Sequence, residues 1–414
     1  MFAVCYIAAT ILTLTLIAVF GRKNTVVALF LGAIAFGILG FMMIPRDGLY
    51  VDTIRFFETL DNTRILSVAN PANGWNYLMM ECGYNATPVI GIIMYVIAQQ
   101  AQNGWLTFLA AAIDVGAGFY LVYMQTRLSK NRSSLYSGII VFLAILIFNG
   151  TVTGVRFCMA GYFTVCVIYK YSRRIDIRAI LLCIPAVFIH PYAMLLVALY
   201  ILSASIKKHK IVYAVLCVPL LLQHRLQDII FSIIDRLSFI PFFSSLSFKS
   251  TQYFGEDAYI GIDSIFSRLR NYALCFVLTV LIVMAIRIGR EKLPLQYIGF
   301  TIMLLCFTYG SYMDQQLFSR CVTILTLVVM PYICVLLDYI LSFHRLYEMI
   351  NVPAIIILFL TIIAAIDNLR AGIRFEVIQL SGYSIALMVV FVALTVCTLA
   401  LCEYFERKPQ VVLA

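Results

Sequence analysis

The stretch SLYSGIIVFLAILIFNGTVTGVRFCMAGYFTVCVIYKYS (residues 134–172) decides the fold, because two apolar runs meet here at a short turn that carries one arginine, Arg156. A run of about 20 apolar residues can cross a bilayer as a helix, which satisfies its own backbone hydrogen bonds. Gly150 and Gly154 bracket the turn between the two runs. The stretch therefore predicts helices that leave the membrane and re-enter it.

The composition extends this prediction to the whole chain. Of the 414 residues, 63% are hydrophobic and only 12% are charged, and the mean hydropathy is +0.97. The hydrophobic fraction is higher, and the charged fraction lower, than in ordinary soluble domains. We predict an all-α polytopic integral membrane protein, a single membrane domain over 1–414, with about thirteen transmembrane helices (range about 11 to 14).

The predicted spans lie at 2–20, 25–44, 104–124, 134–150, 157–172, 178–190, 191–206, 211–222, 272–288, 295–312, 321–341, 352–367 and 383–402. The segment 178–222 has an alternative, two long spans with short re-entrant pieces. The first run has no basic leader and no small-residue cleavage site, so it is interpreted as a span. Two long exterior loops, 45–103 and 223–271, are expected to carry short amphipathic helices.

The basic residues predict an orientation. Lys and Arg gather in alternate short loops, which marks those loops as cytoplasmic and places the N-terminus outside and the C-terminus inside. The formal net charge of +10 then reflects cytoplasmic anchoring, and no nucleic-acid partner is expected. Asp114 and Asp338 are the acids placed inside spans, without an obvious basic partner, and packing or water-cavity roles are favoured for them.

The sequence lacks the motifs typical of disulfide, zinc and nucleotide chemistry. The twelve cysteines lie mostly in apolar runs, and the sequence contains no Cys-x-x-Cys motif. The cysteines are therefore interpreted as packing residues. There is no zinc-ligand spacing, no Gly-x-x-x-x-Gly-Lys loop and no Asp-x-Asp pair. We therefore expect neither a metal nor a cofactor.

Two arginines predict an anion site on the exterior face. Arg156 follows the turn at the start of a helix, where free backbone N–H groups and a partial positive charge favour phosphate. Arg320 begins the inward-going span at 321–341 in the same way. Two cations suit a pyrophosphate better than one. The alternative is an arginine that extends to the lipid headgroups.

Other candidate residues lie on the same predicted face. The first exterior loop contains Tyr50, Asp52 and Arg55 among aromatic residues, and His190-Pro191 interrupts an apolar run. Asp52 or His190 could act as a general base, and His190 could instead contact phosphate. The alternatives are a solvated pair for Asp52 and Arg55, and a structural histidine.

Two further segments are predicted to lie on the exterior side of the membrane. The second loop mixes acids, arginines that include Arg270, and aromatic residues, which suits sugar binding but is also typical of a solvated loop. The apolar segment 87–98 is short for a crossing, so it is predicted to be an interfacial or re-entrant helix.

The order of these motifs resembles that of the EpsG/Wzy-type bacterial polysaccharide polymerases, which are membrane glycosyltransferases related to the GT-C class. The resemblance covers most of the first 330 residues. It rests on motifs that include Asp52, Arg156, Arg320 and the segment Phe188-Ile-His190-Pro191. The sequence departs from the family pattern where Thr87-Pro88 replaces Glu-Pro-Gly, where Phe157 replaces a glutamine, and where Tyr192 replaces a serine.

The resemblance implies a GT-C-like fold and polymerisation of oligosaccharide repeat units linked to undecaprenyl pyrophosphate. The reaction would make O-antigen, capsular polysaccharide or exopolysaccharide, as in lipopolysaccharide biosynthesis. It would occur on the outer (periplasmic) face of the bacterial cytoplasmic (inner) membrane, without a metal and with inversion. The lipid-linked oligosaccharide is the expected donor and acceptor, and membrane lipids and a chain-length regulator of the Wzz type are the expected partners.

The residue roles that follow are hypotheses. Arg156 and Arg320 would stabilise the pyrophosphate leaving group, Arg55, Tyr50 and Arg270 would contact substrate, and Asp52 or His190 would take the proton.

The strongest alternative is a flippase or transporter of the same lipid-linked oligosaccharide. Transporters place their binding groups near the bilayer midplane, whereas the charged residues here gather at one face. Other alternative functions are those of a GT-C enzyme that adds a single sugar, a transferase similar to O-antigen ligases, and a membrane acyltransferase.

Overall fold

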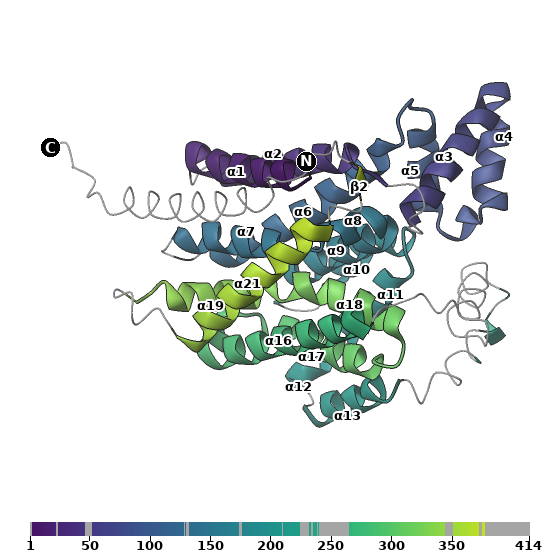
Figure 1. The fold of residues 1–414 in the computed structure, drawn as a ribbon. Coiled ribbons are helices and arrows are strands. Elements are labelled where there is room, and N and C mark those ends of the chain that lie inside the picture. The colour runs from purple at the N-terminus through teal and green to yellow at the C-terminus, as the bar shows by residue number, and fades with distance from the viewer. Residues whose placement is uncertain are drawn as a thin grey trace.

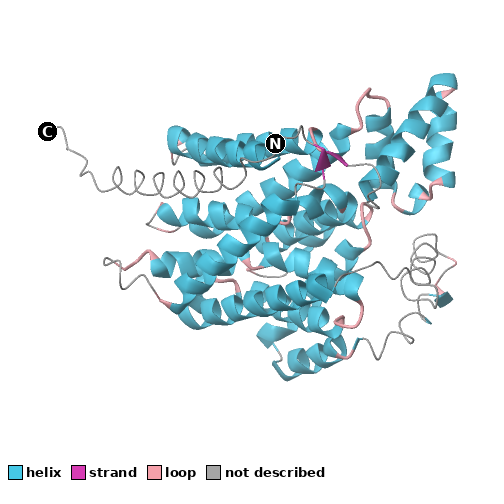
Figure 2. Ribbon diagram, viewed as in Figure 1, coloured by secondary structure: helices cyan, strands magenta, loops and turns pink. Residues whose placement is uncertain are grey.

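The computed structural model describes residues 2–21, 24–45, 52–127, 129, 132–173, 176–208, 210–223, 232, 235–237, 239, 265–343, 351–371 and 375–376. Within these residues the elements are helices, apart from a two-residue antiparallel pairing of β1 (Ile44–Pro45) with β2 (Phe375–Glu376) (Figure 2). The predicted helical class is confirmed. The predicted span 383–402, Tyr50 and most of the loop 223–271 lie outside the described residues.

The helices follow in chain order. They are α1 (Phe2–Phe20), α2 (Thr25–Phe41), α3 (Asp52–Ala69), α4 (Pro71–Asn76), the π-helical turn η1 (Tyr77–Glu81), the 3₁₀ turn η2 (Tyr84–Ala86), α5 (Pro88–Ala98), α6 (Gly104–Thr126), α7 (Ser133–Ile145), α8 (Phe148–Thr153), α9 (Val155–Lys170), α10 (Ile177–Val187), α11 (Tyr192–Leu202), α12 (Ser205–Lys208), α13 (Lys210–Leu221), α16 (Ile265–Gly289), the 3₁₀ turn η3 (Arg290–Lys292), α17 (Leu295–Gly310), α18 (Gln315–Val328), α19 (Met330–Ile340) and α21 (Val352–Ala371).

Four described helices are long and apolar enough to cross a membrane: α1, α6, the run Arg268–Lys292 through most of α16, and α21. The pair α18 and α19 qualifies as a fifth span, bent by 41°. Pro331, near the start of α19, has no N–H to donate to the preceding turn, which accounts for the bend. The predicted span 321–341 is therefore a bent pair of helices, and the total of thirteen spans stays a prediction.

Two of the predicted spans are short. The segments expected at 178–190 and 191–206 contain α10 and α11, of 11 residues each. At 1.5 Å per residue such a helix is about 16 Å long, roughly half of the hydrocarbon core. The chain thus turns between two half-length helices at the His190-Pro191 step.

Several apolar helices expose large apolar side chains. Phe30 on α2 and Phe359 on α21 are 64% and 65% exposed, and Val19 on α1 is 75% exposed. Large apolar side chains on the outside of a helical bundle are suited to lipid rather than water. Together with the long apolar helices, they indicate a membrane-embedded protein.

Helix α6 lies inside the bundle and packs against α2 and α9. Gly40 of α2 makes a close approach possible, since a Cβ there would lie 2.6 Å from the carbonyl oxygen of Thr107 on α6. Small residues at helix contacts are typical of membrane proteins.

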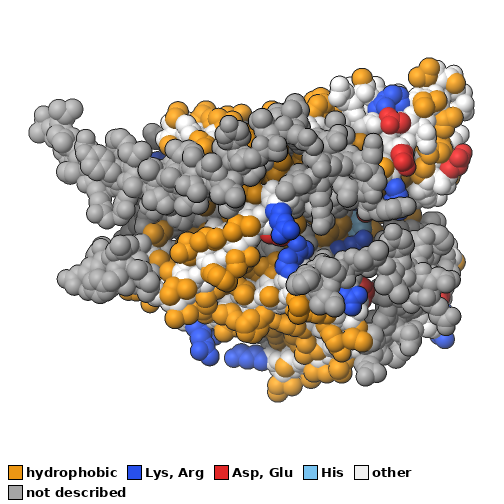
Figure 3. All heavy atoms as spheres, viewed as in Figure 1, with side chains coloured by type: hydrophobic (Ala, Val, Ile, Leu, Met, Phe, Trp, Pro, Cys, Tyr) orange, Lys and Arg blue, Asp and Glu red, His pale blue; other side chains and the backbone are white. Residues whose placement is uncertain are grey.

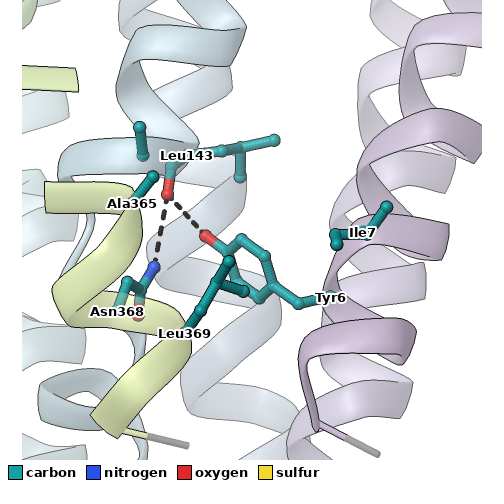
Figure 4. Close-up of a pocket in the computed structure, with 7 residues that line it drawn as sticks. Tyr6, Ile7, Leu143, Ala365, Asn368 and Leu369 are labelled. Atoms are coloured by element: carbon teal, nitrogen blue, oxygen red, sulfur yellow. Dashed lines mark hydrogen bonds between the residues drawn. The ribbon is translucent and has the colours of Figure 1, made fainter. Parts of the chain in front are cut away.

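The break between α7 and α8 is stabilised by two distant helices (Figure 4). The hydroxyl of Tyr6 on α1 donates to the carbonyl oxygen of Leu143 at 2.6 Å, and the Asn368 side chain on α21 donates to the same oxygen at 3.4 Å. The side-chain Oδ1 of Asn368 accepts a hydrogen bond from the Phe148 backbone N–H at 3.3 Å. These bonds satisfy backbone groups that a helix break would otherwise leave unpaired, and they fix the position of α8.

Helices α3, α4 and α5 lie together at one end of the bundle (Figure 1). Acidic and basic side chains gather over α3 and α4, whereas much of the remaining described surface is hydrophobic (Figure 3). Helix α3 buries Phe56 and Leu60 and exposes Arg55 and Glu58, and α5 is an apolar helix of 11 residues. The predicted amphipathic helix and the predicted short apolar helix are thus both present in the first loop.

Candidate functional site

The first turn of α9 carries Arg156. Helix α8 ends at Thr153, Gly154 makes the turn, and α9 begins at Val155. Arg156 is therefore the second residue of a 16-residue helix, whose first N–H groups have no partner within the helix. Because the helix dipole is positive at this end, the backbone and the arginine favour the same anionic ligand.

Aromatic rings hold the Arg156 guanidinium in place. Its central carbon lies 5.0 Å from the ring centroid of Phe56 on α3 and 5.4 Å from that of Tyr84 on η2. Among the described residues no carboxylate lies within ion-pair distance of Arg156. A cation–π contact uses no N–H donor of the guanidinium, so these donors remain for a bidentate contact with an anion such as phosphate.

The next residue, Phe157, connects Arg156 to the other predicted residues. The Arg320 guanidinium carbon lies 5.7 Å from the centroid of the Phe157 ring. The same ring makes edge contacts with His190 and Tyr192, at centroid distances of 5.7 Å and 4.9 Å. The structure thus brings Arg156, His190 and Arg320 to one end of α9, although they are far apart in the sequence.

Arg320 differs in one respect from the prediction. It is the sixth residue of α18 and does not lie in the first turn. The carboxylate of Asp314 caps this helix and accepts from the N–H groups of Gln316 and Leu317, each at 3.0 Å. The start of α18 is therefore occupied by an internal anion, and the helix-start anion site exists at α9 alone of the two.

Asp52 is the first residue of α3 and forms an ion pair with Arg55, one turn later. Its side chain is 40% exposed. Thr53 fixes the start of α3, because its buried hydroxyl donates to the Val152 carbonyl oxygen of α8 at 2.6 Å. This bond joins the start of α3 to the turn that precedes Arg156.

The environment of Tyr84 shows that these charges share one region. Burial raises the pKa of the Tyr84 phenol, the neighbouring Asp52 raises it as well, and the positive charges of Arg156 and Arg55 lower it. The phenol therefore stays neutral at physiological pH. Its ring offers Arg156 an uncharged aromatic face.

His190 lies in the turn between α10 and α11, as predicted. Its Nδ1 accepts a hydrogen bond from the backbone N–H of Tyr192 at 3.2 Å. In a neutral imidazole an accepting Nδ1 places the proton on Nε2. The Nε2 atom is then a hydrogen-bond donor and not a proton acceptor.

Arg270 has a different setting. It lies on α16 and forms an ion pair of 2.9 Å with Asp367 of α21, in which both side chains are about half exposed. The structure places it in a contact between these two helices and not against the Phe157 ring.

Thr53 and Tyr84 were not selected from the sequence. The Tyr84 ring contacts Arg156, which lies 72 positions later, and Thr53 bonds to a residue 99 positions later. The sequence around each of these two residues gives no sign of its long-range contact. The motif that includes Asp52 did, however, place candidate site residues at the start of this helix.

Within the described residues, His, Cys, Asp and Glu side chains do not form a group of three or more that could hold a metal ion. The ten cysteines among them are all free. No known protein family matches this chain, and neither a curated protein nor a solved structure shows detectable similarity to it.

Proposed function

We propose that the protein is a membrane glycosyltransferase that polymerises oligosaccharide repeat units carried on undecaprenyl pyrophosphate. The single observation that supports it most is the setting of Arg156, at an uncapped helix start, stacked on two rings and without a carboxylate partner among the described residues. The resemblance to the EpsG/Wzy-type polymerases adds the substrate class. A GT-C-like arrangement with about thirteen spans belongs to the same proposal.

In this proposal Arg156 and Arg320 bind the pyrophosphate of the donor. Two guanidinium groups neutralise the charge that develops on the leaving oxygen, which lowers the barrier most if they are fixed in advance. The rings of Phe56, Tyr84 and Phe157 supply that fixation. His190 Nε2 donates a further hydrogen bond to the leaving group.

The reaction is a single displacement. The acceptor hydroxyl oxygen attacks the anomeric carbon of the donor sugar, the bond from that carbon to the pyrophosphate oxygen breaks, and the electron pair leaves with undecaprenyl pyrophosphate. Asp52 takes the hydroxyl proton. Its pair with Arg55 is exposed and contributes little free energy, so it can open when the acceptor enters.

The proposed location follows from the basic loops. With the N-terminus outside, the start of α9 faces the exterior of the bacterial cytoplasmic membrane. Donor and acceptor are then both lipid-linked units in the outer leaflet, with a chain-length regulator as a possible partner.

The test is gel analysis of surface glycan from the native host after clean deletion of the gene. Complementation with the wild-type gene should restore a ladder of repeats, whereas the deletion strain and the Arg156→Ala strain should show glycan with a single repeat. Loss of all surface repeats, with lipid-linked units accumulating inside, would instead identify a flippase and overturn the mechanism.

A further inference from the structure

A basic pocket lies far from Arg156 along the bundle. It has a volume of about 120 Å³, roughly ten times the space that one water molecule requires. Helix α6 begins at Gly104, beside α5, and its last residue, Thr126, lines this pocket. About 33 Å of helix therefore separates the pocket from the α3 end of the molecule.

The lining combines two arginines with hydroxyl groups. The polar lining residues are Arg127, Arg132, Thr25, Tyr123, Thr126 and Ser129. Leu135 adds an apolar wall. The hydroxyl hydrogens of Thr25, Thr126 and Ser129 are already donated, to the Gly21 carbonyl oxygen, the Val122 carbonyl oxygen and the Asp338 carboxylate. The two guanidinium groups are therefore the donors that suit an oxyanion.

Arg132 is anchored but keeps an unused donor. One of its Nη atoms donates to the Ile17 carbonyl oxygen at 2.6 Å, and its guanidinium carbon lies 5.6 Å from the Tyr136 ring centroid. Its Nε is buried and has no hydrogen-bond partner among the described residues. A buried charged donor without a partner costs free energy, which a bound anion would recover.

No described carboxylate neutralises this pair of arginines. Neither Arg127 nor Arg132 has an acid within ion-pair distance among the described residues. Asp338 is the neighbouring acid, since it accepts from Ser129 at 2.5 Å, and it forms an ion pair of 2.6 Å with Lys292. The expectation that Asp338 lacks a basic partner was therefore wrong, and its charge is already compensated.

Two helix starts add to the positive potential. Helix α2 begins at Thr25, which lines the pocket, and α7 begins at Ser133, directly after Arg132. Neither helix has a side-chain hydrogen bond at its N-cap. Uncapped starts of helices of this length attract anions.

We infer that this pocket binds a phosphate group at the membrane face opposite Arg156. An anionic phospholipid headgroup and free phosphate offer the same chemistry. The pocket lies where apolar helices end, and basic pockets between such helices are typical sites for anionic lipid headgroups. The inference does not depend on the glycosyltransferase proposal.

The experiment measures binding to the purified full-length protein in detergent. The two probes are phosphatidylglycerol and inorganic phosphate. Zwitterionic phosphatidylcholine is the control lipid without a net charge. The pocket variant is Arg127→Gln with Arg132→Gln. The matched control is Arg287→Gln with Arg290→Gln, which removes the same charge from two exposed arginines at the end of α16 and in η3.

The wild type and the control variant should bind phosphatidylglycerol equally well, and the pocket variant should bind it at least about tenfold more weakly, the loss expected for one charge-assisted hydrogen bond. A parallel loss for inorganic phosphate would identify a free-anion site, and a loss for the lipid alone would identify a headgroup site. Equal affinity of the pocket variant and the wild type for both probes, or equal weakening in the control variant, would overturn the inference.

Arg132 also makes structural contacts, so the double variant could fail to fold. The single change Arg127→Gln avoids this problem, because Arg127 is exposed. It should weaken phosphatidylglycerol or phosphate binding severalfold while the thermal midpoint without probe stays unchanged. Unchanged affinity for both probes would contradict the inference on its own.

Discussion

Arg64 and Arg156 show two ways in which one end of this protein holds an arginine. The Nε of Arg64 donates to the carbonyl oxygens of Ala98 and Gln100, at 3.1 Å and 2.9 Å, and its Nη atoms donate to Asn103 and Asp61. Arg156 is instead held on the faces of two rings. An arginine whose three side-chain nitrogen atoms all donate to the protein is structural, whereas one held by cation–π contacts keeps its donors for a ligand.

The largest effect should follow from Arg156→Lys. Lysine keeps the charge but loses the planar fork and the stacking, so kcat/KM should fall by about 10³-fold. The thermal midpoint should stay within the error of the wild type. The measurement is polymerisation of a lipid-linked repeat by the purified protein, and full activity would remove Arg156 from the reaction.

The variant Asp52→Asn tests the proposed proton acceptor at the start of α3, the helix that also carries Arg64. Loss of the proton acceptor should lower kcat by about 10²-fold. Arg55→Gln is the control, because it removes the ion-pair partner and leaves the carboxylate. If both changes gave the same moderate loss of kcat, Asp52 would be only an ion-pair residue.

Arg64→Met should produce the opposite pattern to Arg156→Lys. The change leaves the Ala98 and Gln100 carbonyl oxygens without this donor, so the free energy of unfolding should fall by about 2 kcal/mol. The readout is the thermal midpoint in detergent. Arg178→Gln, at a largely exposed arginine that pairs with Asp176 at 3.5 Å, should leave the midpoint almost unchanged. A stable Arg64→Met protein with a lower kcat would show that the two arginines were assigned the wrong way round.

The smallest effect should come from the ion pair between Arg270 and Asp367. Both side chains are about half exposed, so Asp367→Asn should change stability by no more than about 1 kcal/mol. If Arg270 also contacts substrate, Arg270→Gln should raise KM severalfold and Asp367→Asn should not. Equal KM values for the two variants would leave Arg270 with its structural role alone.

The sequence predicted the helices better than it predicted their interruptions. Helices α1 and α6 lie at the predicted spans 2–20 and 104–124, because long apolar runs carry a strong local signal. The break between α7 and α8 was not predicted, since Tyr6 and Asn368 stabilise it from 137 and 220 positions away. No local pattern contains such partners.

In the candidate site, too, local sequence predicted some features, whereas others depend on distant contacts. Arg156, His190 and Arg320 were selected because charged or helix-breaking residues interrupt the apolar sequence. The structure places His190 and Arg320 against the ring of Phe157, the residue next to Arg156. The tautomer indicated for His190 depends on a backbone contact, and the cap at the start of α18 comes from Asp314. Contacts of this kind decide which roles remain open, and they appear only once the helices are packed.

The most direct test of the central claim is the affinity of the purified wild-type, Arg156→Lys and Arg64→Met proteins for undecaprenyl pyrophosphate. We predict that Arg156→Lys binds at least about tenfold more weakly than the wild type, as the loss of a charge-assisted contact requires. Folded Arg64→Met protein should bind with wild-type affinity. Equal affinity of Arg156→Lys and the wild type would contradict the claim that Arg156 keeps its donors for an anionic ligand.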